Sequence, residues 1–180
     1  MGRPLLCALL LYKHGSAAWF SAFNCPTVPA SLESNHGRSL WCEMRVTLSC
    51  RSDQVAIQFE AQRVAAYESP VAELQGASLV FDDLGTLSEL RVRGIESLCP
   101  YELKKVIQGN MNREIQVDLH STYDSSCDMG YIYLDRRGPA SVAYTVVSDE
   151  GVCIDIGTDG VILGLEIFSP SKFLPALAAV

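Results

Sequence analysis

A weak internal repeat is the feature of this sequence that most constrains its fold. When the chain is shifted by 75 residues, positions 48–100 align with positions 123–175 without a gap. Eight of these 53 positions are identical: Asp53/Asp128, Ile57/Ile132, Ala65/Ala140, Val71/Val146, Gly76/Gly151, Gly85/Gly160, Leu90/Leu165 and Pro100/Pro175. Such self-similarity predicts two copies of one folding unit. Copies of about 70 residues bury little surface alone, so we expect them to share one core.

The apolar positions of the two segments coincide as well. Six further pairs are apolar in both: Phe59/Leu134, Leu79/Ile154, Phe81/Ile156, Leu87/Ile162, Val92/Ile167 and Leu98/Phe173. Several follow a period of two on both sides of a matching glycine, as expected when alternate residues of a hairpin face one core. We therefore predict an α+β, mostly β class, with two tandem β-meander repeats that each end in a short helix and share one core.

Local patterns place the elements of each copy. In the second copy we expect strands at 131–134, 142–147, 152–156 and 161–168, with a tight turn at 157–160. In the first copy we expect strands at 55–59, near Val71, at 78–81 and at 86–93. Alternating strands at 44–48 and 115–119 precede the copies, and short helices are expected at 101–108 and 172–177. The expected domains are a poorly ordered extension at 1–43, a first repeat at 44–110 and a second at 111–180.

The amino-terminal segment contains one apolar run, Pro4–Tyr12. This run is too short to cross ~30 Å of hydrocarbon as a helix, so we expect no transmembrane anchor there. A weak signal peptide is one alternative because Arg3 precedes the run, although Lys13 follows it directly and no clean cleavage motif comes next. A second alternative is that translation starts at Met44, where ordered alternation begins.

Charge and cysteine content exclude several classes of protein. The chain has 14 Lys+Arg against 21 Asp+Glu, which gives a net charge of −7, and it has no basic stripe. Because nucleic-acid affinity depends on clustered Lys and Arg, we expect no nucleic-acid partner. The seven cysteines are odd in number and include no C-x-x-C pair. We therefore expect reduced thiols, no zinc site and a cytoplasmic protein.

The second copy resembles DUF2283, a family of small domains of unknown function. The matching motifs are Tyr123-Asp124, Asp128, Tyr131–Leu134, Gly151–Asp155, Asp159–Ile167 and Ser169–Lys172, within about 123–175. The first copy departs from this pattern, with Val80, Glu89 and Arg91 where the second has Asp155, Gly164 and Glu166. The resemblance implies a mostly β prokaryotic protein with no assigned catalysis and at most a binding or interaction role. Some such domains resemble antitoxin partners in two-gene toxin modules.

Five carboxylates of the second copy form the candidate chemical site: Asp124, Asp128, Asp155, Asp159 and Glu166. Paired carboxylates can bind a hard cation or share a proton. Their spacing does not fit an EF-hand loop, and Asp128 and Asp159 occupy turn positions, where a short side chain bonds the backbone. We therefore expect turn chemistry or solvated surface. Glu166 lies in mid-strand and is expected to face solvent or to pair with a cation such as Lys172.

Other reactive residues are weaker candidates. His14, His36 and His120 lack ligand spacing, although Asp118 and His120 should share one strand face. Cys153 is expected to be a small core residue rather than a nucleophile. The chain has no G-x-S-x-G elbow, and the Gly157–Gly160 turn lacks the lysine of a P-loop. We expect no catalytic, cofactor-binding or metal-ligating residues and no cofactor.

Three functions stay open at this point. The first is a non-enzymatic interaction module whose strand edges contact a second copy or a protein partner, with Arg91 and Arg93 blunting an edge. The second is an antitoxin-like partner that covers a small basic toxin by charge complementarity. The third, least favoured, is a carboxylate-dependent enzyme that uses Asp155 and Glu166. We expect no membrane partner for any of them.

Overall fold

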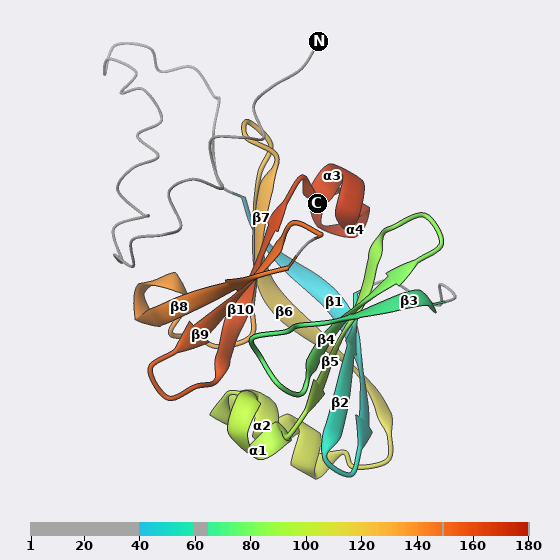
Figure 1. Cartoon of the computed structure of the whole chain (residues 1–180), viewed down its shortest axis with the longest axis vertical. Coiled ribbons are helices and arrows are strands. Elements are labelled where there is room, and N and C mark those ends of the chain that lie inside the picture. The colour runs from blue at the N-terminus through green and yellow to red at the C-terminus, as the bar shows by residue number, and fades with distance from the viewer. Residues whose placement is uncertain (1–39, 60–64, 149, 180) are drawn as a thin grey trace. The chain divides into compact units, whose positions relative to one another are not determined.

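Ten antiparallel strands form one sheet in the computed structural model, which describes residues 40–59, 65–148 and 150–179. The strands are β1 (Leu40–Arg51), β2 (Gln54–Gln58), β3 (Ala65–Pro70), β4 (Ala77–Asp82), β5 (Leu87–Arg93), β6 (Glu114–Asp124), β7 (Met129–Tyr133), β8 (Val142–Val147), β9 (Val152–Gly157) and β10 (Ile162–Phe168). The short helices of the described residues are α1 (Ile95–Leu98), α2 (Tyr101–Gly109), α3 (Pro170–Phe173) and α4 (Pro175–Ala178), and Pro139–Ser141 form a 3-10 turn, η2. The predicted mostly β fold is confirmed (Figure 1).

The strand order is β3-β4-β5-β2-β1-β6-β7-β10-β9-β8. Each half therefore consists of a hairpin followed by a three-stranded meander, and the last strand of the meander pairs with the second strand of the hairpin. The prediction of one continuous meander per half was wrong in this respect. Apolar periodicity shows which residues of a strand face the core, but it does not show which strand lies beside it.

This strand order also corrects the role expected for Arg91 and Arg93. Both lie on β5, which is flanked by β4 and β2 in the interior of the sheet. They do not blunt an edge, because the two edges are β3 and β8.

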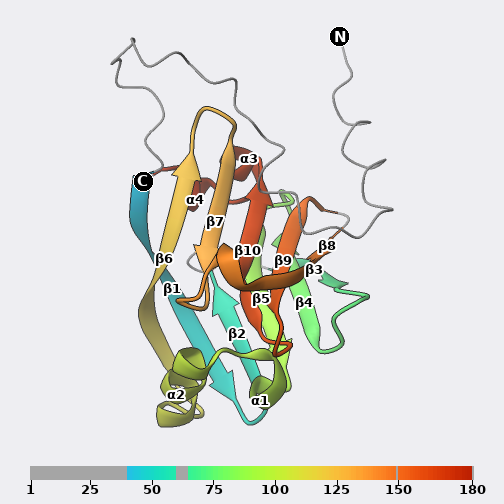
Figure 2. The ribbon, with the colours of Figure 1, turned by 90° about the vertical axis from the view of Figure 1, so that its left-hand side faces the viewer.

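The long strands β1 and β6 join the two halves (Figure 2). Their register pairs Leu40 with Tyr123, Leu48 with Ile115 and, in the middle, Met44 with Leu119. Ile115 lies 75 positions after Leu40, and Tyr123 lies 75 positions after Leu48. The pairing is therefore symmetric about Met44 and Leu119, which are themselves 75 positions apart.

Elements of the two halves match at the same spacing. The bounds of β2 and β7, β4 and β9, β5 and β10, and α1 and α3 each differ by 75 residues. Left-handed backbone conformations recur at this spacing in Gly76 and Gly151, Gly85 and Gly160, and Gly94 and Ser169. β3 and β8 differ by 77 because the segment before β3 is two residues shorter. Duplication of an ancestral unit stays a prediction with which this spacing agrees.

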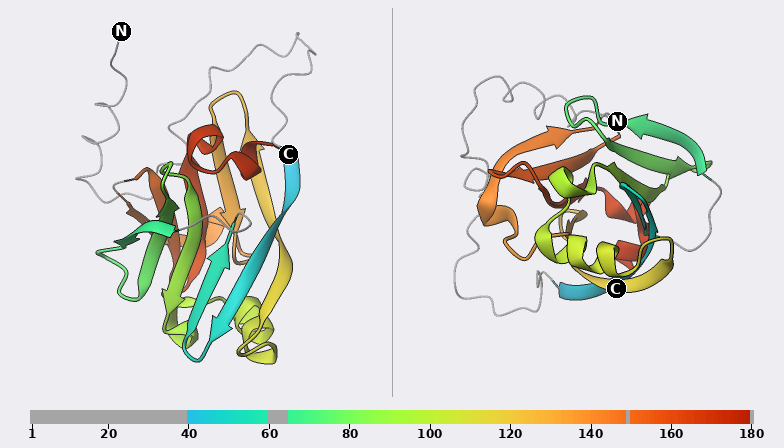
Figure 3. Two further views of the ribbon diagram at one scale, coloured as in Figure 1. Left: turned by 90° about the vertical axis from the view of Figure 1, so that its right-hand side faces the viewer. Right: turned by 90° about the horizontal axis from the view of Figure 1, so that it is seen from below.

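The sheet curls so that its inner face surrounds one hydrophobic core (Figure 3). Alternate residues from both halves, including Leu48, Ile57, Ile132 and Leu165, are fully buried in it. Helices α1 and α2 lie at one end of the curled sheet, and α3 and α4 lie at the other. Their buried side chains, which include Leu103, Ile107, Leu174 and Leu177, close the two ends of the core.

Several elements differ from the predicted bounds. β1 begins at Leu40, so four residues assigned to the extension belong to a strand. The helix expected at 172–177 is two short helices, because Pro175 opens a new one. Val71 follows β3 as a buried loop residue. The apolar run at Pro4–Tyr12, with His14 and His36, lies outside the described residues. No helix in the described part of the chain is long and apolar enough to cross a membrane.

Candidate functional site

Three of the five predicted carboxylates lie in turns or directly beside one. Asp124 Oδ1 accepts from the backbone N–H of Ser126 at 2.9 Å and from its hydroxyl at 2.6 Å. Asp128 accepts from the N–H of Ser171 at 3.2 Å and from its hydroxyl at 2.6 Å, which ties the β6–β7 turn to α3. Asp159 forms an ion pair with Arg137 at 2.9 Å. Asp124 therefore bonds within its own turn, as the turn interpretation expects, and Asp159 also accepts from the N–H of Val161 at 3.5 Å. Asp128 instead contacts Ser171, 43 positions away.

The other two carboxylates, Asp155 and Glu166, lie together on the outer face of the second half. Ile132, Leu165 and Ile154 form a row across β7, β10 and β9 that points into the core. Because side chains alternate across a strand, the neighbouring rows point outward. One outer row contains Tyr131, Glu166 and Cys153, and the other contains Tyr133, Gly164, Asp155 and Thr145.

Tyr131, which sequence reasoning did not select, is the residue that completes this group. Its side chain is buried, with 8% exposure, and Asp155 is buried beside it, with 5%. The Tyr131 ring covers Gly164, where an added Cβ would lie only 2.5 Å from ring carbon Cε1. We call Tyr131, Asp155 and Glu166 the outer cluster. The alternation of Tyr131-Ile132-Tyr133 was the available signal, since it places both rings on the face opposite the core.

The electrostatics of the outer cluster are those of unbalanced negative charge. Burial raises the pKa of Glu166, and the nearby charge of Asp155 raises it further. Burial likewise raises the pKa of Tyr131, with a further increase from Asp155. Asp155 accepts a hydrogen bond from the Thr145 hydroxyl at 2.6 Å. The Tyr131 hydroxyl lies close to Asp155, but it makes no hydrogen bond of ordinary length and angle with any described residue.

The predicted alternatives for Glu166 were both incorrect. Glu166 is half-buried rather than solvated. The ammonium of Lys172 lies 4.6 Å from the centre of the Phe173 ring, and no ion pair joins it to Glu166 within the described chain. The outer cluster therefore holds two carboxylates without a cation from the described residues.

The remaining candidates do not add a reactive group. Cys153 is buried, as predicted, and burial raises the pKa of its thiol to about 12, so it is not a thiolate at neutral pH. Asp118 and His120 share one exposed face of β6, but Asp118 pairs with Arg45 at 3.1 Å. Among residues 40–59, 65–148 and 150–179, no group of three His, Cys, Asp or Glu residues could hold a metal ion.

The edge strand β8 is a second candidate surface. The N–H of Ser148 bonds the carbonyl of Val152 at 2.9 Å, so Thr145 and Val147 direct their backbone groups away from β9. Tyr144 and Val147 expose 50% and 53% of their surface. Val147 lies opposite Cys153 on β9, and on the other edge Pro70 lies opposite Ser78 on β4. Pro70 therefore takes the matching position on β3, and it has no backbone N–H. The uncharged sequence VAYTVV of β8, compared with AAYESP of β3, was the signal for this difference.

Comparison with known family models gives a match within the second half. Residues 120–171 match the family model of DUF2283, described as a protein of unknown function. The match includes all three residues of the outer cluster and the whole of β8. It does not extend to residues 44–110, so the diverged first copy stays a prediction. No curated protein and no solved structure matches the chain.

Proposed function

We propose, from the DUF2283 domain at residues 120–171, that this chain is a non-enzymatic protein-interaction module whose β8 edge pairs with an extended strand of another protein. The observation that carries the proposal is the position of β8 at the edge of the described sheet, with no proline and no charge within its bounds. Val147 directs its backbone N–H and carbonyl away from β9, and the side chains of Tyr144 and Val147 are exposed beside them. An added strand bonds such backbone groups, while pockets for alternate side chains give specificity.

The contrast between the two edges supports this proposal. Proline and charge are the devices that keep edge strands from pairing, and β3 has both in Glu68 and Pro70. β8 has neither within its bounds. A second copy of the chain is a less suitable partner than a different protein, because each copy has a net charge of −7 and the copies repel.

The chemistry of the described residues supports a non-enzymatic role. Asp124, Asp128 and Asp159 are engaged in turns, and Cys153 is protonated and buried. The four cysteines whose side chains are described, Cys50, Cys99, Cys127 and Cys153, are free thiols. Free thiols are common in reducing compartments, which supports a cytoplasmic location.

Site-specific photocrosslinking of the full chain tests the proposal. A benzophenone amino acid replaces Tyr144 on β8 or, as the matched control, Tyr67 on β3. We expect one defined adduct with a different protein from position 144 in native cells and none from position 67. The substitution Val147→Pro removes an N–H that β9 does not use, so it should abolish the adduct without lowering Tm. Adducts from both positions, an adduct that survives Val147→Pro, or an adduct with a second copy would contradict the proposal.

An antitoxin-like role is the second candidate function. The acidic net charge of −7 and the uncompensated carboxylates of the outer cluster both favour a basic partner. Under this proposal the crosslinked protein is small and basic and is encoded beside this chain. A carboxylate-dependent enzyme that uses Asp155 and Glu166 has the least support, since the neighbouring Cys153 thiol is buried and its pKa is raised.

A further inference from the structure

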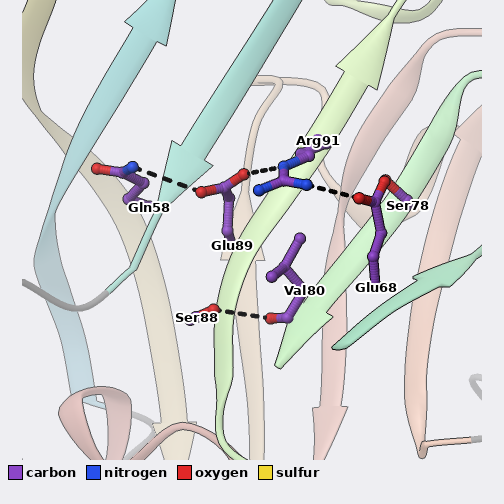
Figure 4. A network of polar contacts seen from close by, with 7 residues as sticks. All are labelled: Gln58, Glu68, Ser78, Val80, Ser88, Glu89 and Arg91. Carbon is purple, nitrogen blue, oxygen red and sulfur yellow. Dashed lines mark hydrogen bonds and ion pairs between the residues drawn. The ribbon is translucent and has the colours of Figure 1, made fainter. Parts of the chain in front are cut away.

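The outer faces of the two halves carry different charges. In the first half, a polar network occupies the position equivalent to the outer cluster (Figure 4). Arg91 lies at the centre of this network and pairs with Glu89 and with Glu68, which is 2.5 Å away. Glu68 also accepts a hydrogen bond from Ser78, and Gln58 donates to Glu89. One guanidinium thus balances two carboxylates.

Glu166 of the second half occupies the position of Arg91. Arg91 lies opposite Ala56 and Ser78, and Glu166 lies opposite Tyr131 and Cys153, each 75 positions later. The outer cluster therefore has two carboxylates, Asp155 and Glu166, where the first half has two carboxylates and a cation. Burial and neighbouring acidic groups raise the pKa of Glu166, Tyr131 and Cys153.

The Tyr131 hydroxyl provides independent evidence for a missing ligand. It is buried among these groups and makes no hydrogen bond of ordinary geometry within the described chain. A buried hydroxyl without a partner costs free energy, so a donor or acceptor from outside is favoured at this position. A guanidinium would supply several N–H donors in one plane, one for this oxygen and others for the carboxylates.

We propose that Tyr131, Asp155 and Glu166 form a binding site for a guanidinium group from outside the chain, which takes the place that Arg91 occupies in the first half. The group is either that of a free small cation or that of an arginine side chain of a partner. Glu166 is the accessible carboxylate, since it is only half-buried. Asp155 is held in place by Thr145. The site goes beyond strand pairing at β8 and does not depend on it.

Titration of the full-length protein with agmatine, followed by NMR on the Tyr131 ring and the Glu166 carboxyl, tests this site. We expect saturable shifts of both resonances, and weaker binding of cadaverine, which has an ammonium in place of the guanidinium. N-acetyl-argininamide separates the sources: tighter binding than agmatine indicates an arginine side chain, and weaker binding indicates a free cation. Shifts that rise linearly without saturation, or equal affinity for cadaverine, would overturn the proposal.

Three variants make the test specific. Glu166→Gln should weaken agmatine binding about tenfold, the factor that corresponds to losing one charged hydrogen bond. Glu166→Arg reproduces the arrangement of Arg91, so it should abolish binding without lowering Tm. Tyr131→Phe should weaken binding while leaving Tm unchanged or higher, an effect that a merely structural role would not produce. Glu114→Gln, at an exposed carboxylate of β6, is the control and should bind as wild type. Wild-type affinity in Glu166→Arg would refute the site.

Discussion

Gly164 shows how one residue shapes the outer face at the scale of single side chains. It has no Cβ, and the Tyr131 ring and the Ile132 carbonyl occupy the space that a Cβ would fill, at 2.5 Å each. Glu89 stands at the equivalent position of the first half, where residue 56 is alanine rather than tyrosine. Tyrosine at 131 and glycine at 164 therefore belong together, because the ring needs the room that the glycine leaves.

The substitution Gly164→Ala should destabilise the fold by about 1–3 kcal/mol, because the ring or the strand must move. Gly109→Ala is the matched control, since nothing lies within 4 Å of its added Cβ and it ends helix α2. It should be neutral or stabilising by up to about 1 kcal/mol. Urea denaturation of both variants measures the difference. Equal stability of Gly164→Ala and wild type would show that the ring does not need this glycine.

Glu166 should lower the stability of the fold as the pH rises, whereas an ion-paired carboxylate raises stability as the pH rises. Its pKa is raised in the folded state by burial and by Asp155, so the folded state holds the proton more tightly than the unfolded chain does. The ionised form therefore lowers stability above the raised pKa, and this cost disappears as pH falls below the ordinary glutamate value of ~4.3.

Glu166→Gln, which cannot ionise, should accordingly be more stable than wild type at pH 7 by a few degrees in Tm. The two proteins should converge near ~pH 4, where wild-type Glu166 becomes protonated. Thermal unfolding of both at several pH values measures this. A wild type that is the more stable protein at pH 7 would mean that Glu166 has a stabilising partner.

At the scale of elements, corresponding parts of the two halves use the same local contacts. The carboxylate of Asp53 accepts from the N–H of Ile95 at 3.0 Å, at the start of α1. The carboxylate of Asp128 accepts from the N–H of Ser171, in the first turn of α3. Each aspartate thereby ties the turn of a hairpin, β1–β2 or β6–β7, to the helix that follows the last strand of its half. The outer faces, in contrast, differ, and Arg91 of β5 has no counterpart on β10.

Arg91→Met should destabilise the chain by about 2–3 kcal/mol, because it leaves Glu89 buried without its cation. This is less than the ~3–5 kcal/mol of a fully buried pair, since the Arg91 side chain keeps 30% exposure. Arg45→Met is the control: Arg45 pairs with Asp118 on β6, but their side chains are 69% and 45% exposed. That change should stay within about 0.5 kcal/mol. Equal losses in both variants by chemical denaturation would contradict the prediction.

At the scale of the whole molecule, one core spans both halves, which are joined by the β1–β6 pair. Ile57 and Ile132 are 75 positions apart, are fully buried and belong to this same core. The core cluster draws buried side chains from both halves, so opening one half would expose the core residues of the other. The two halves should therefore unfold as one cooperative unit.

Ile57→Ala and Ile132→Ala should each cost about 2–5 kcal/mol and should lower the midpoint of a single calorimetric transition. Hydrogen exchange should become faster in both halves of either variant, including the strands of the half that is not mutated. Two separate transitions, with only one displaced by each substitution, would show instead that the halves are independent domains.

The sequence alone determined the local features of this protein. The period-two apolar pattern identified the residues that face the core, and α2 and β8 were predicted within one residue. The turn at Gly157–Gly160 and the turn positions of Asp128 and Asp159 were likewise predictable. These features depend on residues close together in the chain or on the strand face to which a side chain points. Predicting them does not require knowing which strand is the neighbour.

Only the tertiary structure decided which strands are neighbours. It placed β5 in the interior, where Arg91 is the centre of a network and does not block an edge, and it placed β8 at the edge of the described sheet. It also brought Tyr131, Asp155 and Glu166 together from three strands and kept Glu166 away from Lys172. These results depend on pairings between distant segments, which are selected by the fit of whole strands and the closure of the shared core, and no local pattern encodes them.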